Sequence, residues 1–230
     1  MPEALADRLS AVRLRIANAC ARAHRDPAGV RMLAVTKLFG PEVVRDAYAL
    51  GLREFGENYV QEMERKAPAL LDLRIDLKEA RFHLIGHLQS NKTKKAAQLF
   101  CAVDSVDSAK LAARLDAELK PLDVMVEVKL STEEAKSGAS EAELPAIMES
   151  IRSSRNLALR GLMTVPPWSE NAELSRPYFA RLRELAARFG VAELSMGMSN
   201  DLDVAIEEGA TLVRVGTALF GRRPPGRTPA

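Results

Sequence analysis

The feature that most constrains this fold is an alternation of short apolar runs with stretches of helical periodicity, repeated eight times along the chain. Strands that alternate with helices predict βα units and a parallel sheet. Eight such units in about 200 residues favour closure into a (β/α)₈ barrel. The alternative, an open doubly wound sheet, usually has a Gly-rich first βα turn, and residues 35–40 (Val-Thr-Lys-Leu-Phe-Gly) are not Gly-rich. The expected strands are residues 32–35, 53–55, 82–85, 100–103, 123–128, 157–163, 193–196 and 212–215.

The stretches between the runs carry apolar residues at helical spacing. Leu5, Leu9, Val12 and Ile16 predict an additional amphipathic helix before Pro27. Three further stripes are Val60, Met63, Ala67 and Leu70; Leu144, Ile147, Met148 and Ile151; and Tyr178, Leu182, Leu185 and Phe189. We therefore expect one α/β domain over residues 1–221, a TIM-type (β/α)₈ barrel with an extra N-terminal helix. Residues 222–230 are basic and Pro-rich and are expected to form a flexible tail.

The composition is that of a water-soluble globular protein, with 47% hydrophobic and 28% charged residues. A formal net charge of +2 is too small to predict a nucleic-acid or anionic-membrane partner. No stretch approaches the roughly 20 apolar residues of a membrane span, and the charged N-terminus does not resemble a secretory signal. The two cysteines lack the spacing of a disulfide framework, which fits a reducing compartment. We expect a cytoplasmic protein.

Lys37 follows the first expected strand, at the end of a barrel where working residues gather. A lysine that points into a dry barrel mouth has a depressed pKa, because burial disfavours its ammonium form. The neutral amine is then a nucleophile towards an aldehyde. The competing interpretation is a lysine at a strand end that extends into solvent. Position alone leaves both interpretations open.

The loops after the seventh and eighth strands predict a phosphate site. Barrels commonly bind phosphate there, through backbone N–H groups and a helix N-terminus. Gly197 and Gly216 permit a close backbone approach, and the hydroxyls of Ser199 and Thr217 can donate to phosphate oxygens. Ser199 or Asn200 is also placed to cap a short helix. The competing interpretation is that these residues form only tight turns and a cap.

Arg214 is unusual within an apolar strand, because a buried guanidinium stays charged and requires an acceptor. Two acceptors are considered, the internal carboxylate of Glu127 and the ring nitrogen of a cofactor. His83 and His87 are four residues apart, but they lie on a strand and its following loop, with no further ligand at metal-binding spacing. We expect no metal site.

Six ordered motifs resemble those of the pyridoxal phosphate homeostasis protein family, over nearly the whole chain. The motifs are residues 34–37 (Ala-Val-Thr-Lys), 55–59 (Phe-Gly-Glu-Asn-Tyr), 83–92 (His-Leu-Ile-Gly-His-Leu-Gln-Ser-Asn-Lys), 162–164 (Leu-Met-Thr), 195–201 (Ser-Met-Gly-Met-Ser-Asn-Asp) and 213–221 (Val-Arg-Val-Gly-Thr-Ala-Leu-Phe-Gly). The resemblance implies a barrel related to the N-terminal domain of alanine racemase. It also implies a role in vitamin B6 homeostasis without an established catalytic activity.

The resemblance further implies that pyridoxal 5′-phosphate (PLP) is the cofactor, held as a Schiff base on Lys37. The expected cofactor-binding residues also include those that hold the phosphate, face the pyridine nitrogen or line the ring. They are Ser199, Gly216 and Thr217 for the phosphate, Arg214 for the nitrogen, and Asn58, His83, Met198 and Asn200 around them. Residues 133–138 fit a lysine-containing loop of the family, but Ala135 stands where serine is more usual. Lys136 is the lysine of that loop.

The same residues favour a carrier over an enzyme. A permanently charged arginine at the ring nitrogen weakens the electron sink that transamination uses. Racemase chemistry needs a second acid or base, which alanine racemases take from a tyrosine on an additional domain. Little sequence follows the eighth strand, so we expect no such domain, and a monomer. Of the three tyrosines, Tyr59 alone is placed to approach the mouth.

We therefore expect a PLP carrier or regulator that binds and exchanges its cofactor, with PLP-dependent apoenzymes as candidate recipients. The first alternative is a small PLP-dependent amino-acid racemase or lyase that uses Lys37 as its base. The second is an aldolase-like barrel whose lysine attacks a phosphosugar directly.

Overall fold

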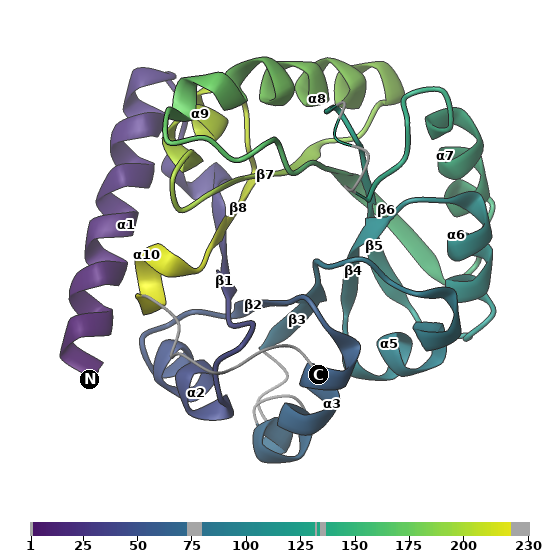
Figure 1. Cartoon of the computed structure of the whole chain (residues 1–230), viewed down its shortest axis with the longest axis horizontal. Coiled ribbons are helices and arrows are strands. Elements are labelled where there is room, and N and C mark those ends of the chain that lie inside the picture. The colour runs from purple at the N-terminus through teal and green to yellow at the C-terminus, as the bar shows by residue number, and fades with distance from the viewer. Residues whose placement is uncertain (1, 73–79, 132, 134–136, 222–230) are drawn as a thin grey trace.

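The computed structural model describes residues 2–72, 80–131, 133 and 137–221. Eight parallel strands close into a barrel in chain order, so each strand pairs with the next and the eighth pairs with the first. Figure 1 shows the ring of strands from the mouth side, with helices around it. The strands are β1 (Arg31–Val35), β2 (Glu54–Glu57), β3 (Arg81–Leu84), β4 (Ala102–Val106), β5 (Leu122–Glu127), β6 (Leu157–Met163), β7 (Glu193–Met198) and β8 (Leu212–Val215). The predicted fold class is confirmed.

Helices cover the outside of the barrel and bury one apolar face each. They are α1 (Pro2–Arg22), α2 (Pro41–Ala49), α3 (Val60–Lys66), α5 (Thr93–Leu99), α6 (Ala109–Asp116), α7 (Leu144–Arg152), α8 (Arg176–Phe189), α9 (Leu202–Glu207) and α10 (Thr217–Phe220). Short 3₁₀ segments lie at Pro27–Gly29, Ala67–Leu70, Ser90–Lys92 and Ala172–Ser175. The predicted stripes of α1, α3 and α7 are buried. In α8 the buried face includes Phe179 instead of the expected Tyr178.

The additional helix α1 packs against α9 and α10, beside the last two βα units (Figure 1). Its arginines reach the carbonyl oxygens that end those helices and loops. Arg15 Nη1 donates to Ser199 O at 2.8 Å, and Arg8 Nε donates to Leu219 O at 2.6 Å. Arg25, three residues beyond the end of α1, donates to Ile206 O and Ala210 O. The extra helix therefore supports the loops that follow β7 and β8.

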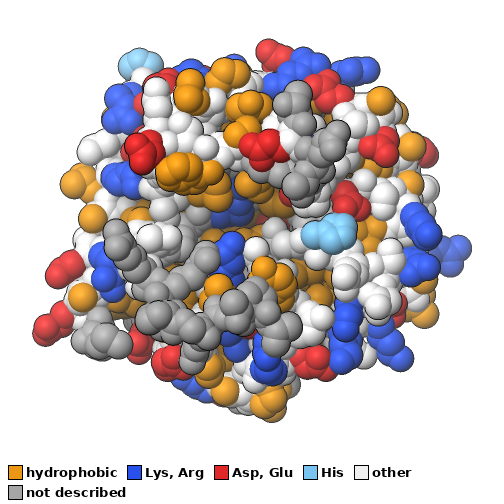
Figure 2. Space-filling view, viewed as in Figure 1, with side chains coloured by type: hydrophobic (Ala, Val, Ile, Leu, Met, Phe, Trp, Pro, Cys, Tyr) orange, Lys and Arg blue, Asp and Glu red, His pale blue; other side chains and the backbone are white. Residues whose placement is uncertain are grey.

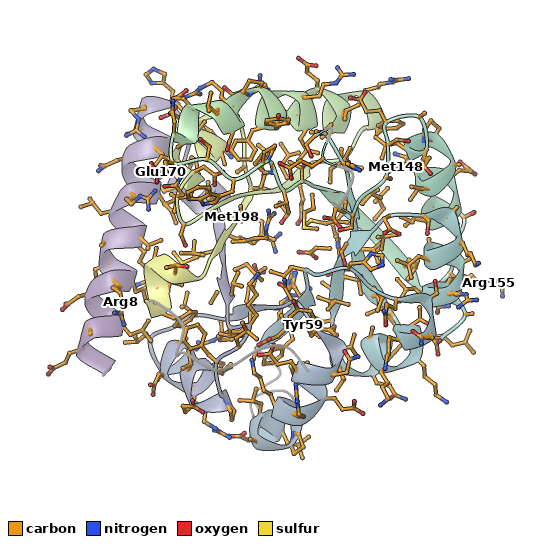
Figure 3. All side chains as sticks on the ribbon, in the orientation of Figure 1. Arg8, Tyr59, Met148, Arg155, Glu170 and Met198 are labelled. Atoms are coloured by element: carbon orange, nitrogen blue, oxygen red, sulfur yellow. The ribbon has the colours of Figure 1, made fainter. Side chains whose placement is uncertain are left out.

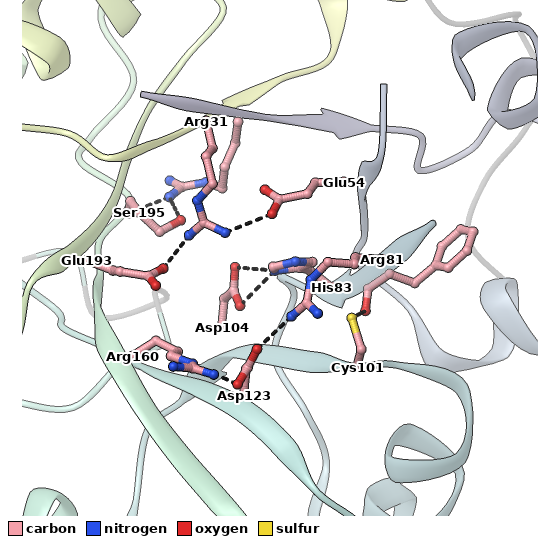
Figure 4. A network of polar contacts seen from close by, with 12 residues as sticks. Arg31, Glu54, Arg81, His83, Cys101, Asp104, Asp123, Arg160, Glu193 and Ser195 are labelled. Carbon is pink, nitrogen blue, oxygen red and sulfur yellow. Dashed lines mark hydrogen bonds and ion pairs between the residues drawn. The ribbon is translucent and has the colours of Figure 1, made fainter. Parts of the chain in front are cut away.

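Two groups of ion pairs lie at the end of the barrel opposite its mouth (Figure 4). Arg31 begins β1 and pairs with Glu54 of β2 and Glu193 of β7. Asp123 of β5 accepts from Arg81 Nη2 at 2.6 Å and from Arg160 Nε at 2.7 Å. A small apolar cluster of Leu33, Met125 and Leu212 is buried separately from the main core. The barrel is thus a packed core and its usable cavity is at the mouth.

Within the described residues, no helix is both long enough and apolar enough to cross a membrane. The expected tail at 222–230 and Lys136 lie outside the described residues.

Candidate cofactor site

A cavity of about 700 Å³ opens at the mouth of the barrel. Figure 2 shows this face, hollowed near its centre and with basic side chains inside the hollow. Eight of the nine residues predicted to bind the cofactor line it, from four different parts of the chain: Lys37, Asn58, Met198, Ser199, Asn200, Arg214, Gly216 and Thr217. Its wall is completed by residues that the sequence did not single out as ligand contacts, among them Phe39, Ile85 and Trp168. The fold therefore brings together residues up to 180 positions apart in the chain, from Lys37 to Thr217.

Lys37 lies two residues beyond the end of β1, and its flanking residues are held by a buried ionic cluster. Thr36 Oγ1 donates to Glu57 Oε1 at 2.7 Å, and Leu38 N donates to Glu62 Oε1 at 2.5 Å. Lys66 of α3 joins the two carboxylates, with Nζ 2.8 Å from Glu57 Oε1 and 2.6 Å from Glu62 Oε1. The same Nζ donates to Thr36 O at 2.9 Å. These contacts hold the backbone on both sides of Lys37 in place.

We call Glu57, Glu62 and Lys66 the anchor cluster. All three are buried, and the second carboxylate oxygens of Glu57 and Glu62 have no hydrogen-bond partner among the described residues. Burial raises the pKa of Glu57, against the opposing effect of the Lys66 charge. Glu57 also precedes Asn58, so the cluster holds two wall segments of the cavity. The sequence analysis missed it, although charged residues on the buried side of a short amphipathic helix were a usable signal.

The loops after β7 and β8 meet through Ser199. Its Oγ accepts from Ala218 N at 3.1 Å, in the first turn of α10. A hydroxyl that accepts this bond still has its own proton to donate. Thr217 begins α10 and lines the same cavity as Ser199, while Leu219 N and Phe220 N of this helix donate to Gly216 O. Donors from two loops therefore converge on one side of the cavity, as the phosphate prediction requires.

One detail of that prediction, the residue that caps the helix, is wrong. Asp201, and neither Ser199 nor Asn200, is the N-cap of α9. Asp201 Oδ1 accepts from Met198 N at 2.7 Å, and Oδ2 accepts from Ser175 Oγ at 2.9 Å, so its carboxylate fixes the turn after β7. Gly197 has φ +89°, and a Cβ there would lie 2.4 Å from Ala205 Cβ, so this glycine admits α9. The close approach at Gly197 is to the protein's own helix.

Arg214 lies in β8 and is 4% exposed. Its Nη1 donates to Ser195 O at 2.6 Å and to Ser195 Oγ at 2.9 Å, and Nη2 donates to Thr164 O at 2.8 Å. Burial lowers its pKa, although nearby carboxylates, Glu127 included, act in the opposite direction. Among the described contacts of Arg214 there is no ion pair with Glu127. The guanidinium is held instead by carbonyl and hydroxyl oxygens of β7 and the β6 loop, so its acceptor among the described residues is not Glu127.

His83 does not line the cavity. It is buried in β3, with Nδ1 3.2 Å from both carboxylate oxygens of Asp104 in β4 (Figure 4). Burial opposes its charging, but the charge and hydrogen bonding of Asp104 outweigh burial and raise the pKa of His83. Its Nε2 is buried without a partner. This position does not support contact between His83 and the pyridine ring of the cofactor, because the side chain is buried against β4 and is not among the residues that line the cavity.

The remaining predicted residues lie on the rim. Met198 ends β7 at the mouth (Figure 3). Asn200 Nδ2 donates to Ser169 O at 2.8 Å, which ties the β7 loop to the β6 loop beside Trp168. Asn58 follows β2, and a Cβ at Gly86 would lie 2.3 Å from Asn58 O, so Gly86 lets the two loops touch. Tyr59 is 39% exposed at the start of α3, outside the cavity wall (Figure 3).

In the part of the chain that the structure describes, no group of three or more His, Cys, Asp and Glu side chains is placed to hold a metal ion.

Comparison with known proteins places this geometry in a family. The family described as "Alanine racemase, N-terminal domain" matches residues 8–224. A pyridoxal phosphate homeostasis protein of Pseudomonas aeruginosa is 46% identical over 228 residues, which cover 96% of this chain and 97% of the relative. The protein of that name in Escherichia coli strain K12 is 38% identical, with coverage of 95% and 97%.

Solved structures agree with these sequence matches. PipY of Synechococcus elongatus PCC7942, a structure with PLP bound, has a TM-score of 0.81 and 38% identity, and covers 94% of this chain and 100% of that chain. An alanine racemase of Clostridium difficile 630 has a TM-score of 0.73 at 14% identity, covering 97% of this chain and 58% of the racemase, a likeness of fold alone. The chain belongs to the pyridoxal phosphate homeostasis protein family, on the barrel of the alanine racemase N-terminal domain.

Proposed function

We propose that this protein binds PLP in the barrel-mouth cavity, as a Schiff base on Lys37, and acts in cytoplasmic PLP homeostasis by binding and exchanging the cofactor. The observation that carries the proposal is that Lys37, Arg214, Ser199 and Thr217 line one cavity. The names of the relatives and the PLP bound to the Synechococcus protein support it.

The cavity residues fit each part of PLP. Bound PLP supplies an aldehyde carbon that a lysine amine can hold covalently. Lys37 provides that amine on a backbone fixed by the anchor cluster. Ser199 and Thr217 provide hydroxyl donors from two adjoining loops, and these suit a phosphate. The volume of about 700 Å³ leaves room beside the cofactor for an exchange partner.

Two features of the cavity favour a carrier over an enzyme. Arg214 remains cationic at neutral pH, and a cation disfavours a second positive charge on a nearby aromatic nitrogen. The described cavity wall also includes none of the three tyrosines, since Tyr48 and Tyr178 lie on outer helices and Tyr59 lies outside the wall. A racemase-type acid on the opposite face therefore has no candidate tyrosine among these residues.

A PLP titration tests the proposal through two signals. The wild type is expected to gain a visible absorption band at a one-to-one ratio, and Lys37→Ala is expected to lose it. The protein has a single tryptophan, Trp168, in the cavity wall, so PLP binding is also expected to quench its fluorescence. Lys95→Ala, on an outer helix, is the matched control and retains both signals. A colourless wild type saturated with PLP contradicts the proposal. It favours the alternative in which Lys37 attacks a phosphosugar directly.

A second experiment separates a carrier from a racemase or lyase. The loaded protein is incubated with alanine and other amino acids in deuterated water, and exchange of the α-proton is followed by NMR. A carrier gives no sustained exchange beyond that of free PLP. Multiple turnovers per site defeat the carrier function.

A further inference from the structure

A second, smaller cavity of about 280 Å³ lies beside the cofactor cavity. Asn58, Ile85 and Val165 line both, so the two spaces share a wall at the barrel mouth. The additional lining of the second cavity comes from the ends of β3 and β5 and the loops after them, and it is strongly polar. Its ionisable members are His87, Glu127 and Lys129, with Ser131 and Ser137 beside them. Neither the fold nor the proposed PLP contacts account for this second space.

Glu127 is the unusual group in this cavity. It ends β5 and is 7% exposed, yet its only hydrogen-bond donor among the described residues is the hydroxyl of Ser137, at 3.3–3.4 Å. Among those residues it forms no ion pair, because Arg214 bonds to Thr164 and Ser195, and His87 pairs with Asp107 at 3.2 Å. A buried carboxylate with one long hydrogen bond is costly, since burial removes the water that would solvate it. Burial accordingly raises the pKa of Glu127.

The backbone is built to cover this carboxylate. Val128 forms a bridge with Ala139, which brings Ser137 and Gly138 over Glu127. Gly138 has φ +116°, and a Cβ there would lie 2.9 Å from Lys129 N and 3.3 Å from Glu127 Cγ. Only glycine fits this approach without strain. The enclosure of Glu127 is therefore a specific feature of the loop after β5.

We propose that the second cavity receives the ammonium group of a small primary amine, with Glu127 as its anion, and that this amine displaces Lys37 when the protein releases its cofactor. The inference rests on the proposed function for the exchange step, but amine binding at Glu127 stands on the second cavity alone. An ammonium supplies both the charge and the short donors that the described residues do not give Glu127. A space of about 280 Å³ suits an amine of the size of glycine or ethylamine.

The exchange balances without an oxidant or reductant. The incoming ammonium gives one proton to the Glu127 carboxylate and becomes a neutral amine. Its nitrogen then forms a C=N bond to the cofactor carbon as the C=N bond to Lys37 Nζ breaks, and its two remaining hydrogens pass to Nζ. The products are a free Lys37 amine and a cofactor joined to the small amine, which is no longer tethered to the chain.

Amine binding is tested first on cofactor-free protein, with ethylammonium chloride and glycine as probes and sodium chloride for constant ionic strength. Saturable shifts of the Ser137 and Lys129 backbone amide signals are expected in NMR spectra. Glu127→Gln keeps the shape of the side chain but removes its charge, and is expected to weaken binding at least about tenfold. Glu149→Gln, on the exposed side of α7, is the matched control and binds as the wild type does. An absence of saturable shifts in the wild type, or equal binding by Glu127→Gln, overturns the inference.

Release is tested on loaded protein. Loss of the Lys37-bound absorption is followed after addition of each amine below saturation, as a rate per loaded site. Glu127→Gln is expected to slow this rate about tenfold relative to both wild type and Glu149→Gln. Equal rates overturn the exchange role. If the wild type forms no lysine-bound absorption, the proposed function fails instead, and the cofactor-free titration still decides the amine site.

Discussion

His83 and Asp104 form a buried pair in the barrel below the cavity, where burial and charge act on the imidazole in opposite directions. The Asp104 carboxylate prevails and raises the pKa of His83 above its ordinary value of 6.5. A histidine whose pKa is raised on folding binds its proton more tightly in the folded state. Its contribution to the free energy of unfolding is therefore complete below about pH 6.5 and is lost as pH rises through the folded pKa.

We predict that His83→Gln costs most stability near pH 6 and progressively less towards pH 9. Urea unfolding of the variant and the wild type at several pH values measures this difference. His24→Asn is the control, because His24 is exposed and asparagine tolerates its left-handed backbone conformation, φ +53°. A difference that stays constant over this pH range would mean that the imidazole is buried in its neutral form.

At the scale of elements, the short helix α3 holds the residues that follow β1 in place through the anchor cluster. Removal of Lys66 alone leaves two carboxylates buried without their cation. Lys66→Met is expected to lower the free energy of unfolding by about 3–5 kcal/mol. Glu64 lies on α3, as Lys66 does, and pairs with Lys95 of α5. Lys95→Met breaks this pair, but the pair is exposed, so the expected cost is about 0–1 kcal/mol.

The mechanism behind this loss has its own test. Adding Glu57→Gln and Glu62→Gln to Lys66→Met removes both stranded charges, so the triple variant is expected to recover part of the stability. Urea unfolding of the four proteins provides the measurement. A triple variant less stable than Lys66→Met would show that hydrogen bonding to Thr36 and Leu38, and not charge balance, is the dominant contribution.

The sequence located some strands more closely than others. The bounds of β6 and β8 agree with the prediction, whereas β4 lies two to three residues further along than expected. Its second half contains Asp104 and Ser105, which are buried because the first pairs with His83 and the second donates to Gly86 O at 2.7 Å. A polar residue with a partner inside a barrel cannot be told from a loop residue by hydrophobic pattern alone.

The same limit applies to the site. Lys37, Ser199, Thr217 and Arg214 could be found because strand ends and Gly-containing turns are visible in the sequence. The acceptors of Arg214 could not, because two of them are backbone carbonyls, of Thr164 and Ser195, that any sequence provides. The pairing of Lys66 with Glu57 likewise depends on how α3 packs against β2, and the spacing of residues in the sequence does not encode that packing.

At the scale of the whole molecule, we predict a monomer of 25.2 kDa. The large hydrophobic side chains that remain exposed come from separate parts of the chain and include Leu14 on α1, Leu119 after α6 and Trp168 at the mouth. Scattered residues of this kind do not form the continuous apolar surface of an obligate dimer. Sedimentation equilibrium with and without PLP measures the mass. A mass near twice that of the chain would contradict the prediction.

The central claim is that this barrel holds PLP covalently on Lys37, and mapping the attachment tests it most directly. The loaded protein is reduced with borohydride, which fixes the cofactor to its lysine, then digested and examined by mass spectrometry. The account predicts one added cofactor per chain, on the peptide that contains Lys37, and none in Lys37→Ala. Attachment mainly at another lysine, or an unmodified Lys37 in saturated protein, would contradict it.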